Sequence, residues 1–263
     1  MSLNATAFYR MLEKWSITRE SILAMRVLPA IDLFEGQVVR LTQGDFAQKN
    51  TYPLSPLQAA LHWKRLGFTF LHVISLDGAR DGAFRYPDLL RTMAEANIHF
   101  QFGGGIRTCE QIQQALDAGA QRVILGTSAI TSTAFWNKAV ERFTAQRLVL
   151  ALDIQDGFVA THGWLRTSPW HPEDVIDHLG ETSILHLLVT DIQRDGCLQG
   201  ANSKPYEKLR KRFPLINIIP AGGVSIPQDL LALDALGIQE VVVGKALYET
   251  PTFIDVIRKH EYL

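Results

Sequence analysis

One apolar stretch that ends in a carboxylate occurs twice in this chain. Residues 28–33 read Leu-Pro-Ala-Ile-Asp-Leu and residues 147–153 read Arg-Leu-Val-Leu-Ala-Leu-Asp, and a turn containing glycine follows each of them. Such runs are typical of buried strands, so Asp32 and Asp153 would lie at the carboxyl-terminal ends of two strands. A chain that repeats this arrangement at a spacing of roughly 120 residues is constrained to a fold with internal symmetry.

Three further motifs recur at nearly the same spacing. Residues 77–82 (Asp-Gly-Ala-Arg-Asp-Gly) align with residues 191–196 (Asp-Ile-Gln-Arg-Asp-Gly), and the Gly-Gly turn that ends in Ile106 aligns with the one that ends in Val224. Residues 123–126 (Val-Ile-Leu-Gly) align with residues 241–244 (Val-Val-Val-Gly). Similar supersecondary units need similar turns, so an architectural explanation exists, but the near-constant offset predicts two similar halves.

Short apolar runs alternate with helical patterns along the whole chain. Eight units in about 240 residues predict an α/β fold, a single (β/α)8 TIM barrel with a twofold half-barrel repeat; an open doubly wound sheet is the alternative. Residues 37–41 add a strand or ribbon, and residues 42–53 and 155–170 are expected to be long loops. We expect the barrel strands at residues 28–33, 70–76, 99–102, 122–125, 147–153, 184–190, 216–220 and 240–243.

Helix starts are marked by capping boxes, in which a Ser or Thr precedes a Gln by three residues. We expect such boxes at Ser55, Thr108 and Ser225. We divide the chain into an N-terminal extension, residues 1–24, and a catalytic barrel, residues 25–263. The extension has no apolar core typical of a signal peptide, and Met25 would be a natural start, so a start-site artefact is one explanation for it.

Composition narrows the classes of function. The chain has 26 Lys and Arg against 27 Asp and Glu, a net charge of −1, which gives no electrostatic support for a nucleic-acid partner or a membrane surface. Its two cysteines have no paired spacing, which fits a reducing compartment. The histidines show no metal-binding spacing, and no Walker loop or GxSxG elbow occurs, so we expect no catalytic metal.

Glycine-rich turns after four of the expected strands are candidate phosphate sites. Glycine lets the backbone approach a ligand, and exposed N–H groups bind anions, although tight turns that need positive φ would also explain these glycines. Loops after strands seven and eight often bind phosphate in barrels. Because the glycines form two symmetric pairs, we predict two phosphates on opposite sides of the mouth and an elongated ligand. The candidate phosphate-binding residues are Gly104, Gly105, Gly126, Thr127, Gly196, Gly222, Gly223, Gly244 and Lys245.

Asp32 and Asp153 are the candidate catalytic pair. Strands one and five are diametrically opposed in an eight-stranded barrel, so the two carboxylates would face each other across the mouth, as an acid–base pair requires. The alternative is a pair of structural aspartates that cap loops. Thr190 ends strand six and either assists Asp153 or is an ordinary strand residue.

Other residues near the expected mouth allow two interpretations each. Trp164 either folds over a flat heterocycle or packs on the barrel rim. Arg40 and Arg107 pair either with a phosphate or with acidic neighbours, and Asp77 and Asp191 are expected to orient other groups rather than to do chemistry. His72 and His186, within apolar strands, are expected to be packing residues.

These motifs together resemble the ProFAR isomerase family of histidine biosynthesis. The residues that carry the resemblance span about residues 26–250: Pro29-Ala30-Ile31-Asp32-Leu33, Val39-Arg40-Leu41, Gln43-Gly44-Asp45, Gly103-Gly104-Gly105-Ile106-Arg107, Thr190-Asp191-Ile192 with Arg194-Asp195-Gly196, and Gly222-Gly223-Val224. The related cyclase subunit of imidazole glycerol phosphate synthase shares the fold and the repeat. Its first strand reads Pro-Cys-Leu-Asp with a lysine soon after, whereas Ala30 and Arg40 match the isomerase.

The resemblance implies an Amadori rearrangement of the aminoaldose ProFAR to the aminoketose PRFAR. It implies that Asp153 is the general acid, Asp32 the general base, and Thr190 an assistant to Asp153, and that Trp164 covers the aminoimidazole. Gly44 and Arg107 are further candidate substrate contacts. It implies no cofactor, and we expect a cytoplasmic monomer whose partner is a small bisphosphorylated substrate. The cyclase and a non-catalytic phosphosugar-binding barrel are the alternatives.

Overall fold

The protein is described by a computed structural model that covers residues 25–260 and 262–263, so the proposed extension, residues 1–24, lies outside the described residues. One sheet of 12 strands is the centre of the fold. Its strands are β1 (Arg26–Phe34), β2 (Gln37–Thr42), β3 (Asp45–Thr51), β4 (Leu71–Ser75), β5 (Phe100–Gly103), β6 (Arg122–Leu125), β7 (Leu148–Gln155), β8 (Phe158–Thr161), β9 (Arg166–Thr167), β10 (His186–Asp191), β11 (Asn217–Ala221) and β12 (Glu240–Val243).

The parallel strands close into a barrel, as the sequence predicts. Neighbouring strands follow the order β1, β4, β5, β6, β7, β10 and β11, and β12 pairs with β1 and packs beside β11. Four steps separate β1 from β7 in either direction around this ring, so the strands that carry Asp32 and Asp153 are diametrically opposed.

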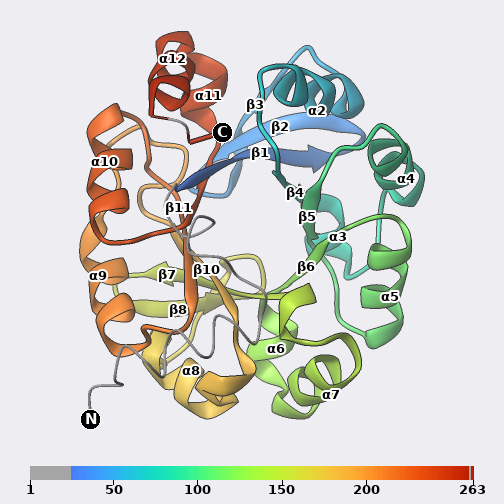
Figure 1. Ribbon diagram of the computed structural model, residues 1–263. Coiled ribbons are helices and arrows are strands. Elements are labelled where there is room, and N and C mark those ends of the chain that lie inside the picture. Colours follow the sequence, from blue (N-terminus) through green and yellow to red (C-terminus); the bar gives the residue numbers. More distant parts are fainter. Residues whose placement is uncertain (1–24, 261) are drawn as a thin grey trace, which may run out of the picture.

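Helices surround the barrel (Figure 1). Their apolar faces pack on the outward-facing residues of the strands, which form the larger of two core clusters. The helices are α2 (Pro56–Arg65), α3 (Leu76–Asp81), α4 (Pro87–Glu95), α5 (Cys109–Asp117), α6 (Thr127–Thr131), α7 (Thr133–Phe143), α8 (Pro172–Leu179), α9 (Ser203–Arg212), α10 (Pro227–Ala235), α11 (Lys245–Glu249) and α12 (Pro251–Lys259), with single 3-10 turns η2 (Ala145–Arg147) and η3 (Glu181–Ser183).

The two expected long loops are largely antiparallel ribbons, which corrects that prediction. β2 pairs with the end of β1, with Val39 opposite Asp32, and β3 pairs with β2. In the other half, β8 pairs with the end of β7, with Ala160 opposite Asp153, and β9 extends it. Polar composition suggested loops, but a ribbon that continues a barrel strand needs no apolar face because much of it is exposed.

Two of the three expected capping boxes are confirmed, at Ser55 with Gln58 and at Thr108 with Gln111. The third is wrong. The helix α10 begins at Pro227, and the carboxylate of Asp229 accepts hydrogen bonds from the backbone of Ser225 and Ile226 in place of the expected Gln228.

Alternation along each strand decides what fills the barrel. Leu28, Ala30, Ile124, Val149 and Leu188 belong to the smaller core cluster, which lies inside the barrel. Because side chains alternate between the two faces of a strand, residues two positions further along also point inward. Each half therefore places one inward aspartate, Asp32 or Asp153, directly above this apolar layer.

Below the apolar layer, at the amino-terminal end of the barrel, lies a buried ionic layer. Glu240 forms an ion pair with Arg26 and a bidentate ion pair with Arg122, in which the shorter N–O distance is 2.7 Å. It also accepts a hydrogen bond from the Asn217 side chain at 2.9 Å. Burial raises the pKa of Glu240, but the two arginines outweigh it and hold the pKa at about 2. His186 lies against Arg122, and burial lowers its pKa to about 3.

His72, on β4, accepts a hydrogen bond at Nδ1 from the side-chain amide of Gln101 on the adjacent strand β5, at 2.7 Å. Burial lowers its pKa to about 3 as well, so both strand histidines are neutral packing residues, as expected.

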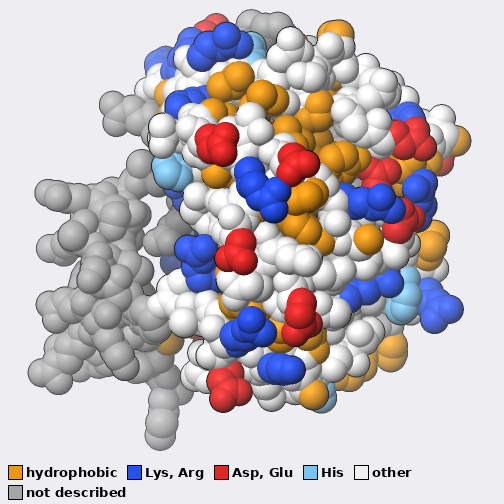
Figure 2. Space-filling model, turned by 90° about the vertical axis from the view of Figure 1, so that its right-hand side faces the viewer, with side chains coloured by type: hydrophobic (Ala, Val, Ile, Leu, Met, Phe, Trp, Pro, Cys, Tyr) orange, Lys and Arg blue, Asp and Glu red, His pale blue; other side chains and the backbone are white. Residues whose placement is uncertain are grey.

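The outer surface carries mixed charge. Lys and Arg side chains alternate with Asp and Glu over the face shown in Figure 2, with apolar side chains between them.

Within residues 25–260 and 262–263, the helices are all too short or too polar to cross a bilayer.

We expect Glu240→Gln to lower the free energy of unfolding by about 3–5 kcal/mol at pH 7, because removal of one partner from a buried ion pair leaves the other charges uncompensated. The depressed pKa of Glu240 means that its contribution is present above the ordinary value of 4.5 and is lost as pH falls towards 2. Denaturant unfolding at pH 7 and pH 3 measures both effects. Asp88→Asn, which removes an exposed pair with Arg91, is the matched control and should change the free energy by less than about 0.5 kcal/mol.

Candidate active site

Asp32 is held by Arg40 at the carboxyl-terminal end of the barrel. The guanidinium of Arg40 donates to the Asp32 carboxylate and to Asp195, each at 2.7 Å, and all three side chains are largely buried. Burial raises the pKa of Asp32, while the adjacent Arg40 opposes that rise. Arg40, which the sequence left between a phosphate and acidic partners, thus pairs with two aspartates.

Asp153 has neutral partners instead. Thr190 lies opposite it in the register of β7 and β10, and the Thr190 hydroxyl and the Trp164 indole lie close enough to lower the pKa of its carboxyl group. Burial raises the pKa of Asp153, and these two groups only partly offset the rise. The two opposed aspartates therefore differ in their surroundings. Asp32 has the cation of Arg40 beside it, whereas the groups that lower the pKa of Asp153 are uncharged.

Asp195 acts on both opposed aspartates. Its charge contributes to the raised pKa of both Asp32 and Asp153, so all three carboxyl groups share one electrostatic environment at the mouth. Asp195 belongs to the repeated Arg-Asp-Gly motif, but nothing in the sequence marked it as a candidate site residue. Its counterpart Asp81 pairs with Arg80 and Arg85 and is part-exposed, so the motif is repeated while only the second copy faces the centre.

The ribbons that follow β1 and β7 meet over this centre. A Cβ atom on Gly44 would lie 2.5 Å from the Trp164 ring, so the indole packs directly on that glycine. Gln43 bonds through its backbone to Asp195 and through its side chain to Gln193. Gly44 and Trp164, predicted separately as substrate contacts, thus lie together beside Asp153.

The glycine turns have matching geometry in the two halves. Gly104 and Gly105 have φ of 103° and 79°, and Gly222 and Gly223 have φ of 86° and 83°. Each pair lies against the backbone that follows the preceding barrel strand, so an added Cβ would collide with it. One unit later, Gly126 and Gly244 share a further unusual conformation, φ near −104° with negative ψ, before short five-residue helices.

The cradle after β11 and β12 is cationic. A hollow there is lined by three turn glycines and by three charged residues, among which two cations outnumber one carboxylate: Gly222, Gly223, Gly244, Arg40, Lys245 and Asp195. Lys245 donates to the carbonyl of Gly196 at 3.0 Å, and the Arg40 guanidinium covers Gly244.

The cradle after β5 and β6 is neutral at the equivalent position, where Thr127 replaces Lys245. The Thr127 hydroxyl accepts a hydrogen bond from the backbone of His162 at 2.9 Å, which ties the Trp164 ribbon to this turn. Arg107 lies against Gly82 and donates to the carbonyl of Ala79. The two glycine turns therefore share a backbone conformation but differ in the charge of the residue that follows Gly126 and Gly244.

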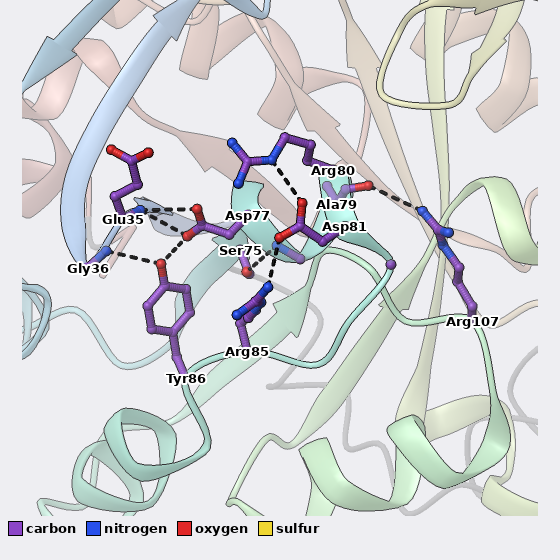
Figure 3. A network of polar contacts seen from close by, with 12 residues as sticks. Glu35, Gly36, Ser75, Asp77, Ala79, Arg80, Asp81, Arg85, Tyr86 and Arg107 are labelled. Atoms are coloured by element: carbon purple, nitrogen blue, oxygen red, sulfur yellow. Dashed lines mark hydrogen bonds and ion pairs between the residues drawn. The ribbon is translucent and has the colours of Figure 1, made fainter.

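Asp77 acts on the backbone, in line with the orienting role expected for it (Figure 3). Its carboxylate accepts hydrogen bonds from the Glu35 backbone, at 2.9 Å, and from the Tyr86 hydroxyl, which in turn accepts one from the Gly36 backbone. Asp77 thus fixes the turn after β1 that carries Asp32. Its counterpart Asp191 is contacted by Asn202 and Arg194 at 3.5 and 3.8 Å.

A closed parallel barrel with two pairs of glycine turns and two opposed buried carboxyl groups at the carboxyl-terminal ends of its strands defines a TIM-barrel protein with a candidate active site at the usual face. The chain belongs to the family described as histidine biosynthesis proteins, whose model matches residues 26–252. Similar proteins include one from Halothermothrix orenii, 40% identical over 240 residues (90% of this chain and 100% of that protein), and one from Alteromonas mediterranea, 38% identical over 229 residues (85% and 94%). Both are named 1-(5-phosphoribosyl)-5-((5-phosphoribosylamino)methylideneamino) imidazole-4-carboxamide isomerase.

We expect Gly105→Ala to destabilise the fold far more than Gly163→Ala. Both glycines have positive φ, but a Cβ at position 105 would lie 2.0 Å from the Gly78 carbonyl oxygen, whereas position 163 has no atom within 4 Å. Backbone strain of about 1–2 kcal/mol is common to both variants. Thermal unfolding of the two should therefore differ by the cost of the collision alone, and equal midpoints would show that the turn can move away from Gly78.

Proposed function

We propose that this protein is the isomerase of histidine biosynthesis that converts the aminoaldose ProFAR to the aminoketose PRFAR. The observation that carries the proposal is the pair of opposed, buried aspartates with unlike partners, placed between two anion cradles. A substrate with a phosphoribosyl group at each end matches two cradles on opposite sides of the mouth, and its reacting ribose would then lie near the aspartates.

The unlike partners support unlike roles. Arg40 favours the ionised form of Asp32, as a general base requires. Burial and the negative charge of Asp195 favour the protonated form of Asp153 that a general acid requires, and its neighbours Thr190 and Trp164 are uncharged. Two titratable groups in contrasting surroundings are the usual mark of an acid–base pair.

In the proposed reaction, Asp153 gives a proton to the ribose ring oxygen as the C1′–O4′ bond breaks, and the amino nitrogen supplies the electron pair that forms a protonated Schiff base. Asp32 removes the C2′ proton, and the electrons of that C–H bond form the C1′–C2′ double bond of an enolamine. Return of a proton to C1′ and loss of the C2′ hydroxyl proton give the ketone. The imine takes up the electrons, so this route balances without an oxidant.

The remaining predicted residues have supporting roles in this proposal. Thr190 orients Asp153, with which it is paired in register. Trp164 leaves the Asp153 carboxyl and covers the aminoimidazole, while Gly44 lets the ring approach. The two phosphates are held by the glycines of the four turns together with Thr127, Gly196 and Lys245. Arg107 lies beside the neutral cradle. We further propose a monomeric, cytoplasmic enzyme.

We expect Asp32→Asn and Asp153→Asn each to reduce kcat by about 10²–10⁴-fold, because each removes a separate proton transfer. Turnover of ProFAR by purified protein is followed spectrophotometrically with the cyclase as coupling enzyme, and calorimetric titration measures whether each variant still binds ProFAR. Asp88→Asn, on the exposed face of α4, is the matched control with unchanged kcat.

Three outcomes distinguish the alternatives. A wild-type rate in either variant would remove that aspartate from the mechanism. Binding of ProFAR by the wild-type protein without turnover would favour a phosphosugar-binding barrel. Ammonia-dependent consumption of PRFAR would favour the cyclase.

We expect Arg40→Met to move the acid limb of the pH profile of kcat/KM to higher pH. Loss of the cation removes the main influence that lowers the pKa of Asp32, so the base is ionised only at higher pH. The control is Arg85→Met, which removes an exposed pair with Asp81 and should leave the limb in place. An unmoved limb in Arg40→Met would mean that a group other than Asp32 controls it.

A further inference from the structure

Strand β12 separates from β1 just where the two strands approach the mouth. Their last register pair is Pro29 with Val243, after which the chain turns through Gly244 into α11. The next carbonyl of β1, that of Ala30, is bonded by the side chain of Tyr248 from α11, at 3.1 Å. A hydroxyl group thus continues the contact between β12 and β1 beyond the end of the backbone ladder.

The orientation of this hydroxyl is fixed from several sides. The indole of the buried Trp63 donates to the Tyr248 oxygen at 3.3 Å, so that oxygen both accepts from α2 and donates to β1. The Tyr248 ring stacks on Tyr52, with centroids 4.2 Å apart, and meets Trp63 edge-on at 5.0 Å. We call Tyr52, Trp63 and Tyr248 the aromatic clasp. Burial raises the pKa of Tyr248, so its hydroxyl stays protonated and able to donate.

The clasp joins two parts of the candidate site that the chain itself leaves far apart. Tyr248 follows Lys245 of the cationic cradle in the same five-residue helix, and Ala30 precedes Asp32 by two positions in the same strand. Tyr52 adds a second tie, because its hydroxyl donates to Glu249 at 3.1 Å and its backbone donates to Val38 beside the Arg40 ribbon.

We propose that Tyr248 is a positioning residue whose hydroxyl sets the distance between the Gly244–Lys245 phosphate cradle and the Asp32 carboxylate. It acts through strand β1 and need not touch the substrate. The inference rests on the proposed isomerase function. A phosphate held in the cradle fixes where the ribose lies, and the hydroxyl fixes where the base lies, so together they decide whether Asp32 reaches the C2′ proton.

The test is Tyr248→Phe, which keeps the ring and its stacking and removes the hydroxyl. A misplaced base slows proton abstraction while phosphate binding persists, so we expect kcat to fall about tenfold and KM to change by less than about twofold. Because the proton transfer becomes slower than other steps, the primary isotope effect with ProFAR deuterated at ribose C2′ should rise. Tyr262→Phe is the matched control, since it removes a hydroxyl that donates to Asp234 at 2.9 Å, outside the site, and should keep wild-type kcat and isotope effect.

Unchanged kcat and isotope effect in folded Tyr248→Phe would overturn the proposal, as would an equal loss in Tyr262→Phe or a rise in KM alone. If circular dichroism shows that Tyr248→Phe does not fold, Tyr52→Phe tests the same connection, because it removes the hydroxyl that donates to Glu249 of the same helix. A smaller fall in kcat with a raised isotope effect would support the proposal. Wild-type values would refute it. Wild-type protein that fails to turn over ProFAR would refute the proposed function, and this role with it, whereas active wild-type protein with unaltered variants refutes the positioning role alone.

Discussion

The closure of β12 onto β1 is the constraint on which the remaining structure depends. Only a closed ring brings the inward-facing side chains of all strands together in layers along the barrel axis. From the amino-terminal end to the mouth, these layers are an ionic base around Glu240, an apolar middle and a layer that carries carboxyl groups. The ionic base costs desolvation energy, but the two arginines keep Glu240 ionised, and burial keeps His186 and His72 neutral. The apolar middle separates this base from the mouth, where burial raises the pKa of Asp32 and of Asp153.

Symmetry in the backbone does not extend to charge. Both halves use the same positive-φ turns and the same unusual conformation at Gly126 and Gly244, yet one cradle presents Lys245 and the other Thr127. The same contrast separates the aspartates, because Arg40 reaches Asp32 while Asp153 has hydroxyl and indole partners. A duplicated scaffold thus carries a difference in charge from one side of the mouth to the other.

Much of this arrangement could be predicted from the sequence, because repeated motifs fix strand order and strand order fixes which ends face each other. Asp32, Asp153 and the glycine turns fall into this class. Contacts between distant side chains could not be predicted: the sequence showed Arg40 and the Asp195 motif but not that they meet, and Tyr248 carried no motif at all. The strand or ribbon expected at residues 37–41 is present as β2, but β3 and β9 were missed because their polar, exposed residues lack the alternation that marks a half-buried strand.

The indole of Trp164 has one further consequence. It packs on Gly44 and lies close enough to Asp153 to influence its pKa, so the protein's own ring lies beside that carboxyl group. In the proposed reaction a sugar that binds at Asp153 displaces this ring, so the affinity for that sugar is a net value that already includes the cost of the displacement. Because the backbone of His162 donates to Thr127, the same displacement would also act on the Gly126–Thr127 turn.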